Sequence, residues 1–266
     1  MTTPKYTNKL ANTVVLVIGG TSGLGFGLAE ALLEHRVAHL YISSSRQQKV
    51  DSAVARLRAA YPDSHATTTV TGLACNLGDE ATLEANIQAL FAQIGRKLDH
   101  VVFTAGDPLA AKPLGDVDMP FMKQAGMVRF FAPFFVAKEA VAHLTPGPAS
   151  SVTLTTGSVS EKPIPNWAVV ASYASGLFGM TRGLALELKP VRVNLISPGG
   201  VDTELWEASL GGDKDKVKAT LEGMKAHTAT GEVGQVEDVV EAFLYVLKDK
   251  NVTGTCIRSD GGVFLM

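Results

Sequence analysis

Short β-branched segments alternate with long amphipathic segments along the whole chain, and this alternation most restricts the possible folds. Two of the amphipathic segments span residues 81–94 and 121–143. Strands that alternate with helices build parallel sheets covered by helices. The sequence therefore predicts the α/β class, with a single Rossmann-type doubly wound parallel sheet of about seven strands and helices on both faces. We expect the strands at residues 14–18, 39–43, 69–73, 100–104, 152–155, 192–196 and 255–258.

The domain organisation predicted from the sequence is simple. A chain of 266 residues without an internal repeat or linker fits one domain covering residues 1–266. The segment 204–230 is rich in glycine and charge and lies between the sixth strand and a helix near Val236. We expect this segment to form a substrate lid.

Composition argues against several classes of partner. The formal charge is −2 and the pI is about 6.3, so no basic field favours nucleic acid or an anionic membrane. Residues 1–12 are polar, and no apolar run reaches membrane-spanning length. Cys75 and Cys256 lack metal-ligand spacing, and both are expected to be reduced core residues. We expect a cytoplasmic protein with no metal, no membrane and no nucleic-acid partner.

The motif "VLVIGGTSGLGFG" joins the first predicted strand to a helix expected to start near Phe26. Gly19, Gly23 and Gly25 would allow a tight turn and a close approach of the backbone to a pyrophosphate. The positive end of the helix would favour that anion. A purely structural turn is the alternative, although the flanking strand and helix argue against it.

The end of the second strand reads "YISSSRQQK". NAD sites usually place a carboxylate here for the ribose 2′-hydroxyl, whereas an arginine accommodates the 2′-phosphate of NADP. No acid occurs before Asp51, so the polar run favours NADPH/NADP+, with Lys49 as a further cation. A solvated polar loop is the alternative. The residues assigned to the cofactor here are Ser43, Ser44, Ser45 and Arg46.

Five ordered motifs resemble the short-chain dehydrogenase/reductase family over nearly the whole chain. They are "IGGTSGLG", "CNLGD", "FTAG", "RVNLISPGGVDT" and "SDGG". The resemblance implies a nicotinamide dinucleotide, an oxidoreductase activity and pairing into a homodimer or homotetramer. The further cofactor-binding residues that it implies are Gly19, Thr21, Ser22, Gly23, Leu24, Gly25, Asn76, Thr104, Ala105, Gly106, Pro198, Gly199, Gly200, Val201 and Thr203.

The catalytic residues depart from the family pattern of Asn, Ser, Tyr and Lys. Aligning "GMTRGLALEL" with the family helix places Val170 at the Tyr position and Ala174 at the Lys position. Arg129 stands at the Asn position, and only Ser158 is retained. The nearby Tyr173 is followed four residues later by Leu177, which cannot tune a phenol. We expect Tyr173 to be a packing residue.

A site without a proton donor favours reduction of a C=N group. Reducing a ketone creates an alkoxide, whereas an iminium carbon is already cationic and needs only hydride. Asp107 would hold such a cation, and its alternative role is a turn residue before Pro108. Arg129 would pair with Asp107, bind a substrate carboxylate, or extend its charged end to solvent.

The loop "EKPIPNW", residues 161–167, precedes the helix that contains Tyr173. We expect Asn166 to be the N-cap of that helix and Trp167 to lie in its first turn. The loop lies beside the expected nicotinamide site. Trp167 and Phe130 would then form a flat pocket for an indole-sized substrate.

The lost Tyr and Lys, together with Asp107, Arg129 and "PNW", resemble divergent fungal members of the family from malbrancheamide- and paraherquamide-type alkaloid pathways. These members are bifunctional. The resemblance implies NADPH-dependent reduction of a cyclic dipeptide-derived iminium and a stereoselective intramolecular Diels-Alder reaction of a prenylated indole alkaloid precursor. It also implies an acid at position 166, where this chain has Asn166. The alternatives are another NADPH-dependent ketone or imine reductase and a catalytically silent NADPH-binding module.

Overall fold

Seven strands form one parallel sheet in the computed structural model, which describes residues 5–109 and 111–266. The strand order is β3-β2-β1-β4-β5-β6-β7, and every neighbouring pair is parallel. This order confirms the predicted doubly wound α/β fold. The first four residues of the polar segment 1–12 lie outside the described residues. The strands are β1 (Val14–Ile18), β2 (His39–Ser44), β3 (Thr69–Ala74), β4 (His100–Phe103), β5 (Ser151–Thr155), β6 (Arg192–Pro198) and β7 (Cys256–Ser259).

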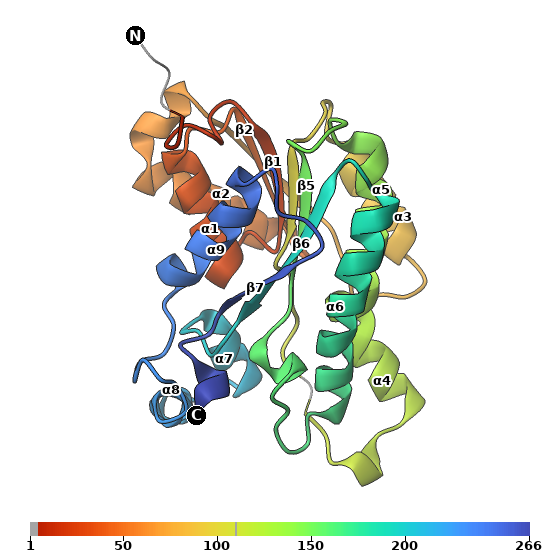
Figure 1. The fold of residues 1–266 in the computed structure, drawn as a ribbon, viewed down its shortest axis with the longest axis vertical. Helices are drawn as coiled ribbons and strands as arrows, with labels where there is room; N and C mark the ends of the chain where they lie inside the picture. Colours follow the sequence, from red (N-terminus) through yellow and green to blue (C-terminus); the bar gives the residue numbers. More distant parts are fainter. Residues whose placement is uncertain (1–4, 110) are drawn as a thin grey trace.

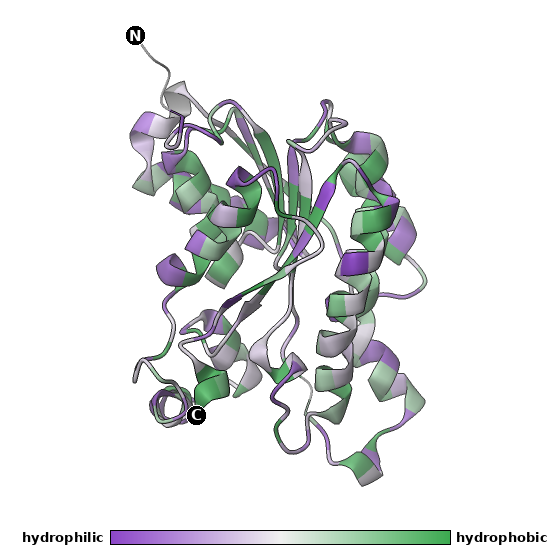
Figure 2. Ribbon diagram, viewed as in Figure 1, coloured by the Kyte–Doolittle hydropathy of each residue, from purple (hydrophilic) through white to green (hydrophobic). Residues whose placement is uncertain are grey.

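Helices cover both faces of the sheet, with α1, α2 and α9 on one side and α3, α5 and α6 on the other (Figure 1). Hydrophobic residues concentrate along the strands and on the helix faces turned toward them (Figure 2). Because both faces are covered, β6 is buried along its whole length. The helix bounds are α1 (Gly23–Glu34), α2 (Gln47–Ala60), α3 (Leu83–Ala92), α4 (Met119–Gly126), α5 (Ala132–His143), α6 (Ala168–Glu187), α7 (Glu204–Ser209), α8 (Lys214–Lys225) and α9 (Val236–Lys248).

The segment predicted as one helix over residues 121–143 contains a π-helical turn. Met127–Phe131 form this turn between α4 and α5. A π turn accommodates an extra residue, so the side chains after it are rotated relative to a regular helix. Arg129 lies in this turn, and the turn therefore sets the direction of its side chain.

Helix α1 begins at Gly23, three residues before the predicted start near Phe26. Ser22 is extended, and Gly23 has a positive φ of 49°. The chain therefore reverses at the glycine itself and enters the helix at once. The backbone N–H groups at this end lie beside the carboxyl edge of the sheet.

The segment 204–230 contains two helices, α7 and α8, at the lower end of the molecule in Figure 1. The role of this segment as a substrate lid stays a prediction. None of the helices within the described residues combines the length and apolar character needed to cross a membrane.

Candidate active site

The glycine-rich turn packs directly against the end of β4. A Cβ added at Gly19 would lie 2.5 Å from the backbone N of Ala105, and Gly19 has a φ of 92°. A Cβ at Gly25 would collide with the carbonyl of Gly19 and the hydroxyl of Thr104. Only glycine fits at these two positions. The turn and the "FTAG" motif therefore lie in direct contact at the carboxyl edge of the sheet.

Backbone donors in this turn fit a phosphate group. The N–H groups of Gly19 and Gly20 both donate to the carbonyl of Ser43, at 2.8 and 3.2 Å. Among residues 5–109 and 111–266, the N–H groups of Thr21 and Ser22 have no hydrogen-bond acceptor. Unpaired donors beside a helix N-terminus are what a pyrophosphate requires. The N–H of Gly23 is different, because it donates to the carboxylate of Glu204 at 2.9 Å.

The adenosine end of the predicted cofactor site is polar and has an exposed cation. Arg46 is exposed at the end of β2, and no carboxylate within the described part of the chain pairs with it. Asp51 accepts a hydrogen bond from Gln47 within α2, at 2.7 Å. Ser44 ends β2 and Ser45 directly precedes Arg46, while Ser43 is fully buried. The contact of Arg46 with a 2′-phosphate stays a prediction.

The other predicted cofactor segments reach the same edge of the sheet. A Cβ on Gly199 would lie 2.8 Å from the carbonyl O of Asp260, so the "SPGG" and "SDGG" segments touch. The methyl group of Thr203 would lie 3.3 Å from a Cβ on Gly23. Asn76 turns its side-chain oxygen onto the N–H of Gly78 at 3.0 Å. Pro198 ends β6, Gly200 and Val201 follow it, Leu24 lies in the first turn of α1, and Gly106 follows β4.

Asp107 and Arg129 form an ion pair just beyond the end of β4. The guanidinium Nε lies 3.1 Å from the carboxylate of Asp107, and the guanidinium also donates to the Asp107 carbonyl. The same group lies against Gly106, where a Cβ would approach it to 2.9 Å. Both side chains are about one-quarter to one-third exposed. The predicted pairing of these two residues is therefore present.

Burial disturbs the ionisation of both partners. Desolvation raises the pKa of Asp107, and the nearby Arg129 charge works in the opposite direction. Desolvation likewise lowers the pKa of Arg129, and Asp107 opposes that shift. The pair therefore places one carboxylate and one guanidinium in a partly dry environment at the edge where ligands bind in such sheets.

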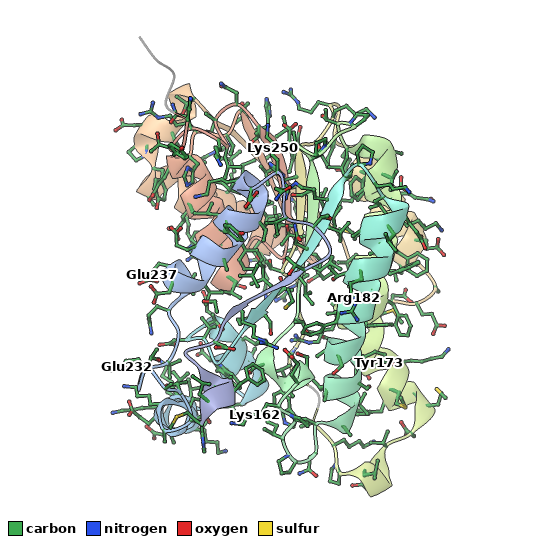
Figure 3. All side chains as sticks on the ribbon, viewed as in Figure 1. Lys162, Tyr173, Arg182, Glu232, Glu237 and Lys250 are labelled. Atoms are coloured by element: carbon green, nitrogen blue, oxygen red, sulfur yellow. The ribbon has the colours of Figure 1, made fainter. Side chains whose placement is uncertain are left out.

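Tyr173 is directed away from this edge. Its ring packs against Phe130 and Phe131, with ring centroids 5.1 and 5.8 Å apart. Its hydroxyl donates to the carbonyl of Met122 on α4 at 3.0 Å, and Figure 3 shows Tyr173 on the part of α6 beside α4. The side chain holds α4 and α6 together, as a packing residue does.

The family's Tyr and Lys positions carry apolar side chains in the structure. Val170 is buried at 8% exposure, and Ala174 is half-buried. The carbonyl of Ala174 accepts a hydrogen bond from the hydroxyl of Thr156 at 2.9 Å. This contact fixes the helix against the end of β5 without supplying a proton donor. Ser158 begins the short helical turn Ser158–Ser160 at the same end.

The predicted capping role of Asn166 is wrong. Trp167 is the N-cap of α6, and Asn166 precedes it with a φ of 68°. Asparagine tolerates this left-handed conformation better than most residues, which explains how the loop turns there. The carbonyl of Asn166 accepts from the N–H of Lys112 at 3.0 Å, so its loop is tied to the segment after Asp107.

Phe130 contributes to helix packing, and its place in a flat substrate pocket stays a prediction. It lies between Phe131 and Tyr173, and a Cβ on Gly176 would approach its ring to 2.7 Å. Trp167 is half-buried on the loop beside Asn166. Of the two aromatic residues assigned to the substrate, Trp167 keeps a place at the carboxyl edge.

Two contacts in the site are not evident from the sequence. Glu204 reaches the N–H of Gly23, and Lys162 donates to the carbonyl of Val263 at 2.8 Å (Figure 3 labels Lys162). Both hydrogen bonds join residues that are far apart in the chain, so no local sequence pattern predicts them. The only sequence signal was an acid directly after the "GGVDT" segment. No group of three or more His, Cys, Asp or Glu side chains in the described regions is placed to hold a metal.

The fold and the glycine turn define the class, a Rossmann-type dinucleotide-binding protein. A family model described as an SDR-like Rossmann domain matches residues 6–266. The chain belongs to this short-chain dehydrogenase/reductase family, and it is therefore an oxidoreductase of small molecules that uses a nicotinamide cofactor.

Three relatives illustrate where the chain lies in the family. It is 46% identical over 264 residues to the short-chain dehydrogenase/reductase fsr5 of Gibberella fujikuroi, covering 98% of both chains. It is 38% identical over 253 residues to malC of Malbranchea aurantiaca, covering 94% of both. The solved structure of that MalC reductase/Diels-Alderase superposes with a TM-score of 0.90 at 37% identity, over 98% of this chain and 99% of MalC. A small-chain dehydrogenase in complex with NADPH superposes at 0.75 with 29% identity, over 96% of this chain and 100% of that chain.

Proposed function

We propose that the protein reduces a cationic C=N group with NADPH in fungal secondary metabolism. One observation carries the proposal. The Tyr and Lys positions hold Val170 and Ala174, and the nearby phenol of Tyr173 is bonded to Met122, away from the cleft. A site without this acid cannot protonate an alkoxide, but an iminium acceptor requires no such proton.

The chain's own groups account for cofactor choice. The unpaired N–H groups of Thr21 and Ser22, at the positive end of α1, hold the pyrophosphate. Arg46 holds the 2′-phosphate with its planar guanidinium, and no carboxylate nearby in the described structure competes for the ribose. When bound, the reduced nicotinamide supplies hydride.

Asp107 and Arg129 act on the substrate in this proposal. The Asp107 carboxylate attracts the cationic nitrogen, and the guanidinium of Arg129 faces an anionic group of the same molecule. A zwitterionic iminium carries both charges and thus complements the pair. Ser158, at the end of the neighbouring strand β5, offers a hydroxyl for orientation.

The finer substrate assignment is a cyclic dipeptide-derived iminium with a prenylated indole. Trp167 would offer a flat apolar surface of the kind that an indole ring covers, and the loop that holds it is tied to the segment after Asp107. The same pocket would then hold the reduced product for a stereoselective intramolecular Diels-Alder cycloaddition. Similarity to the MalC reductase/Diels-Alderase, at a TM-score of 0.90, supports this assignment.

A second candidate function is reduction of an imine or ketone without cycloaddition. Identity to fsr5, at 46%, exceeds the 38% identity to malC. In addition, position 166 carries an exposed amide in place of the acid that the resemblance implies. These two observations favour a reductase with a related but different substrate.

A substrate panel with product analysis tests the proposal. Purified protein is incubated with NADPH and either a cyclic dipeptide iminium or matched cyclic ketones, and NADPH oxidation is followed. Preferred turnover of iminium compounds supports C=N reduction, and preferred turnover of ketones contradicts it. For the indole substrate, chiral chromatography separates the outcomes further. A single enantiomer of cycloadduct supports the bifunctional assignment, whereas a racemic adduct leaves the protein as a reductase alone.

A further inference from the structure

Helix α7 is held by a hydrogen bond at each of its ends. At its first residue, Glu204 accepts a hydrogen bond from the N–H of Gly23 at 2.9 Å. At its last residue, the hydroxyl of Ser209 accepts from the N–H of Leu109 at 3.3 Å. Between them, Trp206 donates to the carbonyl of Val201 at 2.8 Å. The helix thus links the glycine turn to the segment that follows Asp107.

The contact at Gly23 uses a group that the cofactor also needs. Gly23 is the first residue of α1, where backbone N–H groups and the helix dipole favour an anion. The Glu204 carboxylate already supplies an anion there. A pyrophosphate entering the same turn would meet a like charge at hydrogen-bonding distance from the same donor. The two anions therefore exclude one another from this N–H.

The neighbouring donors show that the carboxylate fills only part of the site. Within the described residues, the N–H groups of Thr21 and Ser22 remain without acceptors while Gly23 is occupied. One carboxylate cannot satisfy a turn that could bind two phosphate groups. The closed position of Glu204 is therefore a partial substitute that a dinucleotide can displace.

We propose that Glu204 is a built-in competitor of the cofactor pyrophosphate, and that α7 is a strap which must release Gly23 before a dinucleotide binds. The proposal rests on dinucleotide binding at the glycine turn and is independent of the substrate. As a consequence, part of the free energy of NADPH binding is spent on opening the Glu204–Gly23 contact. If the closed form holds about nine molecules in ten, the apparent Kd for NADPH is about tenfold weaker than that of the open form.

The chain offers a matched control on the same helix. Glu207 lines the same hollow as Glu204, a cavity of about 470 Å³ between α7 and α8 that also contains Lys214 and Lys218. Among the described residues, Glu207 makes no hydrogen bond or ion pair with the glycine turn. Removing its charge changes the local field and leaves the Gly23 contact intact.

Binding to the cofactor-free protein tests the proposal. NADPH is titrated by fluorescence into the wild type and the Glu204→Gln, Glu204→Ala and Glu207→Gln variants, with thermal unfolding as a check on folding. Both Glu204 variants are expected to bind NADPH about 3- to 30-fold more tightly, and Glu207→Gln is expected to match the wild type. Adenosine 2′-monophosphate, which has no pyrophosphate, is expected to bind all four proteins within about twofold of one another.

Each outcome of these titrations either supports or overturns the competitor role of Glu204. Unchanged or weaker NADPH binding by folded Glu204 variants overturns the proposal, and so does an equal gain for adenosine 2′-monophosphate. A Ser209→Ala variant, which cuts the other end of the strap, is expected to tighten NADPH binding in the same direction, and its failure to do so contradicts the strap. If no protein in the set binds a nicotinamide dinucleotide, the cofactor assignment itself fails and the competitor role fails with it.

Discussion

Three single residues determine separate properties of the proposed site: Arg46, Tyr173 and Asn166. Arg46 concerns the choice of cofactor, Tyr173 concerns the missing acid, and Asn166 concerns the charge near the substrate. The three side chains lie on different loops or helices. Substitutions at the three positions therefore test cofactor choice, the missing acid and the charge near the substrate separately.

Replacing Arg46 with alanine should weaken NADPH far more than NADH. The guanidinium offers a planar fork to the 2′-phosphate, which NADH lacks. We expect the apparent constant for NADPH to rise by about 10-fold to 100-fold, and that for NADH to change by less than about threefold. Steady-state kinetics with both cofactors measures this. Equal effects on the two cofactors would remove Arg46 from the site.

Tyr173→Phe should leave reductase turnover nearly intact. The hydroxyl donates to the Met122 carbonyl, so its loss is expected to cost about 0.5–1.5 kcal/mol of stability and no catalysis. Turnover and urea unfolding of the same preparation separate the two effects. A fall of about 100-fold in turnover with the fold intact would show that the phenol serves as an acid.

Asn166→Asp should accelerate reduction of a cationic acceptor. Asparagine and aspartate both tolerate the left-handed backbone at this position, so stability should change little. A carboxylate attracts the cation and relays a proton, and we expect a gain of about 10-fold to 10³-fold. Single-turnover oxidation of NADPH with a cyclic dipeptide iminium measures it. Equal rates for the Asn and Asp proteins would end the proposed role of position 166.

At the scale of elements, the strands were predictable and the local geometry of the site was not. Hydrophobic periodicity and β-branched residues predicted both ends of all seven strands to within two residues of the observed ends. Burial on both faces of the sheet leaves this strong pattern in the sequence. The π turn at Met127–Phe131 and the left-handed Asn166 have no such pattern. They depend on contacts with other segments, as does the Glu204–Gly23 hydrogen bond. Pairing with Asp107 was one of the three roles that the sequence left open for Arg129, and it is present, whereas the predicted cap at Asn166 is wrong.

His100 should make the central sheet sensitive to acid. It is buried on β4, and its Nδ1 lies 2.9 Å from the Ser151 hydroxyl on β5. Burial, followed by the charges of Arg192 and Lys250, lowers the pKa of His100 to about 3. The unfolded chain takes up this proton near its ordinary pKa of about 6.5. Stability is therefore fully present above about pH 6.5 and is lost as the pH falls toward about 3.

His100→Gln removes this titration while offering another polar side chain to Ser151. Between about pH 7 and about pH 5, the wild type should lose on the order of 1–2 kcal/mol more unfolding free energy than the variant. Urea unfolding at both pH values measures the difference. Identical losses in the two proteins would mean that His100 is not the acid-sensitive group.

At the scale of the whole molecule, the fold brings together at one edge the loops that follow β1, β2, β4, β5 and β6. The ion pair, the glycine turn and α7 meet there because all strands are parallel and end on the same side. Sequence reasoning could therefore place the site without knowing any contact within it. The reaction could not be predicted in the same way, because it depends on which charged groups face the substrate acceptor.

This site is proposed to serve a cationic acceptor and to lack the acid that a ketone needs. The direct measurement is the single-turnover rate of NADPH oxidation with a permanently cationic N-methyl iminium and with a ketone of the same ring skeleton. Each rate is divided by the rate of the uncatalysed reaction in the same buffer, which removes intrinsic reactivity. We expect an acceleration at least about 100-fold larger for the iminium, on the scale of one missing general acid. An equal or larger acceleration of the ketone would contradict it.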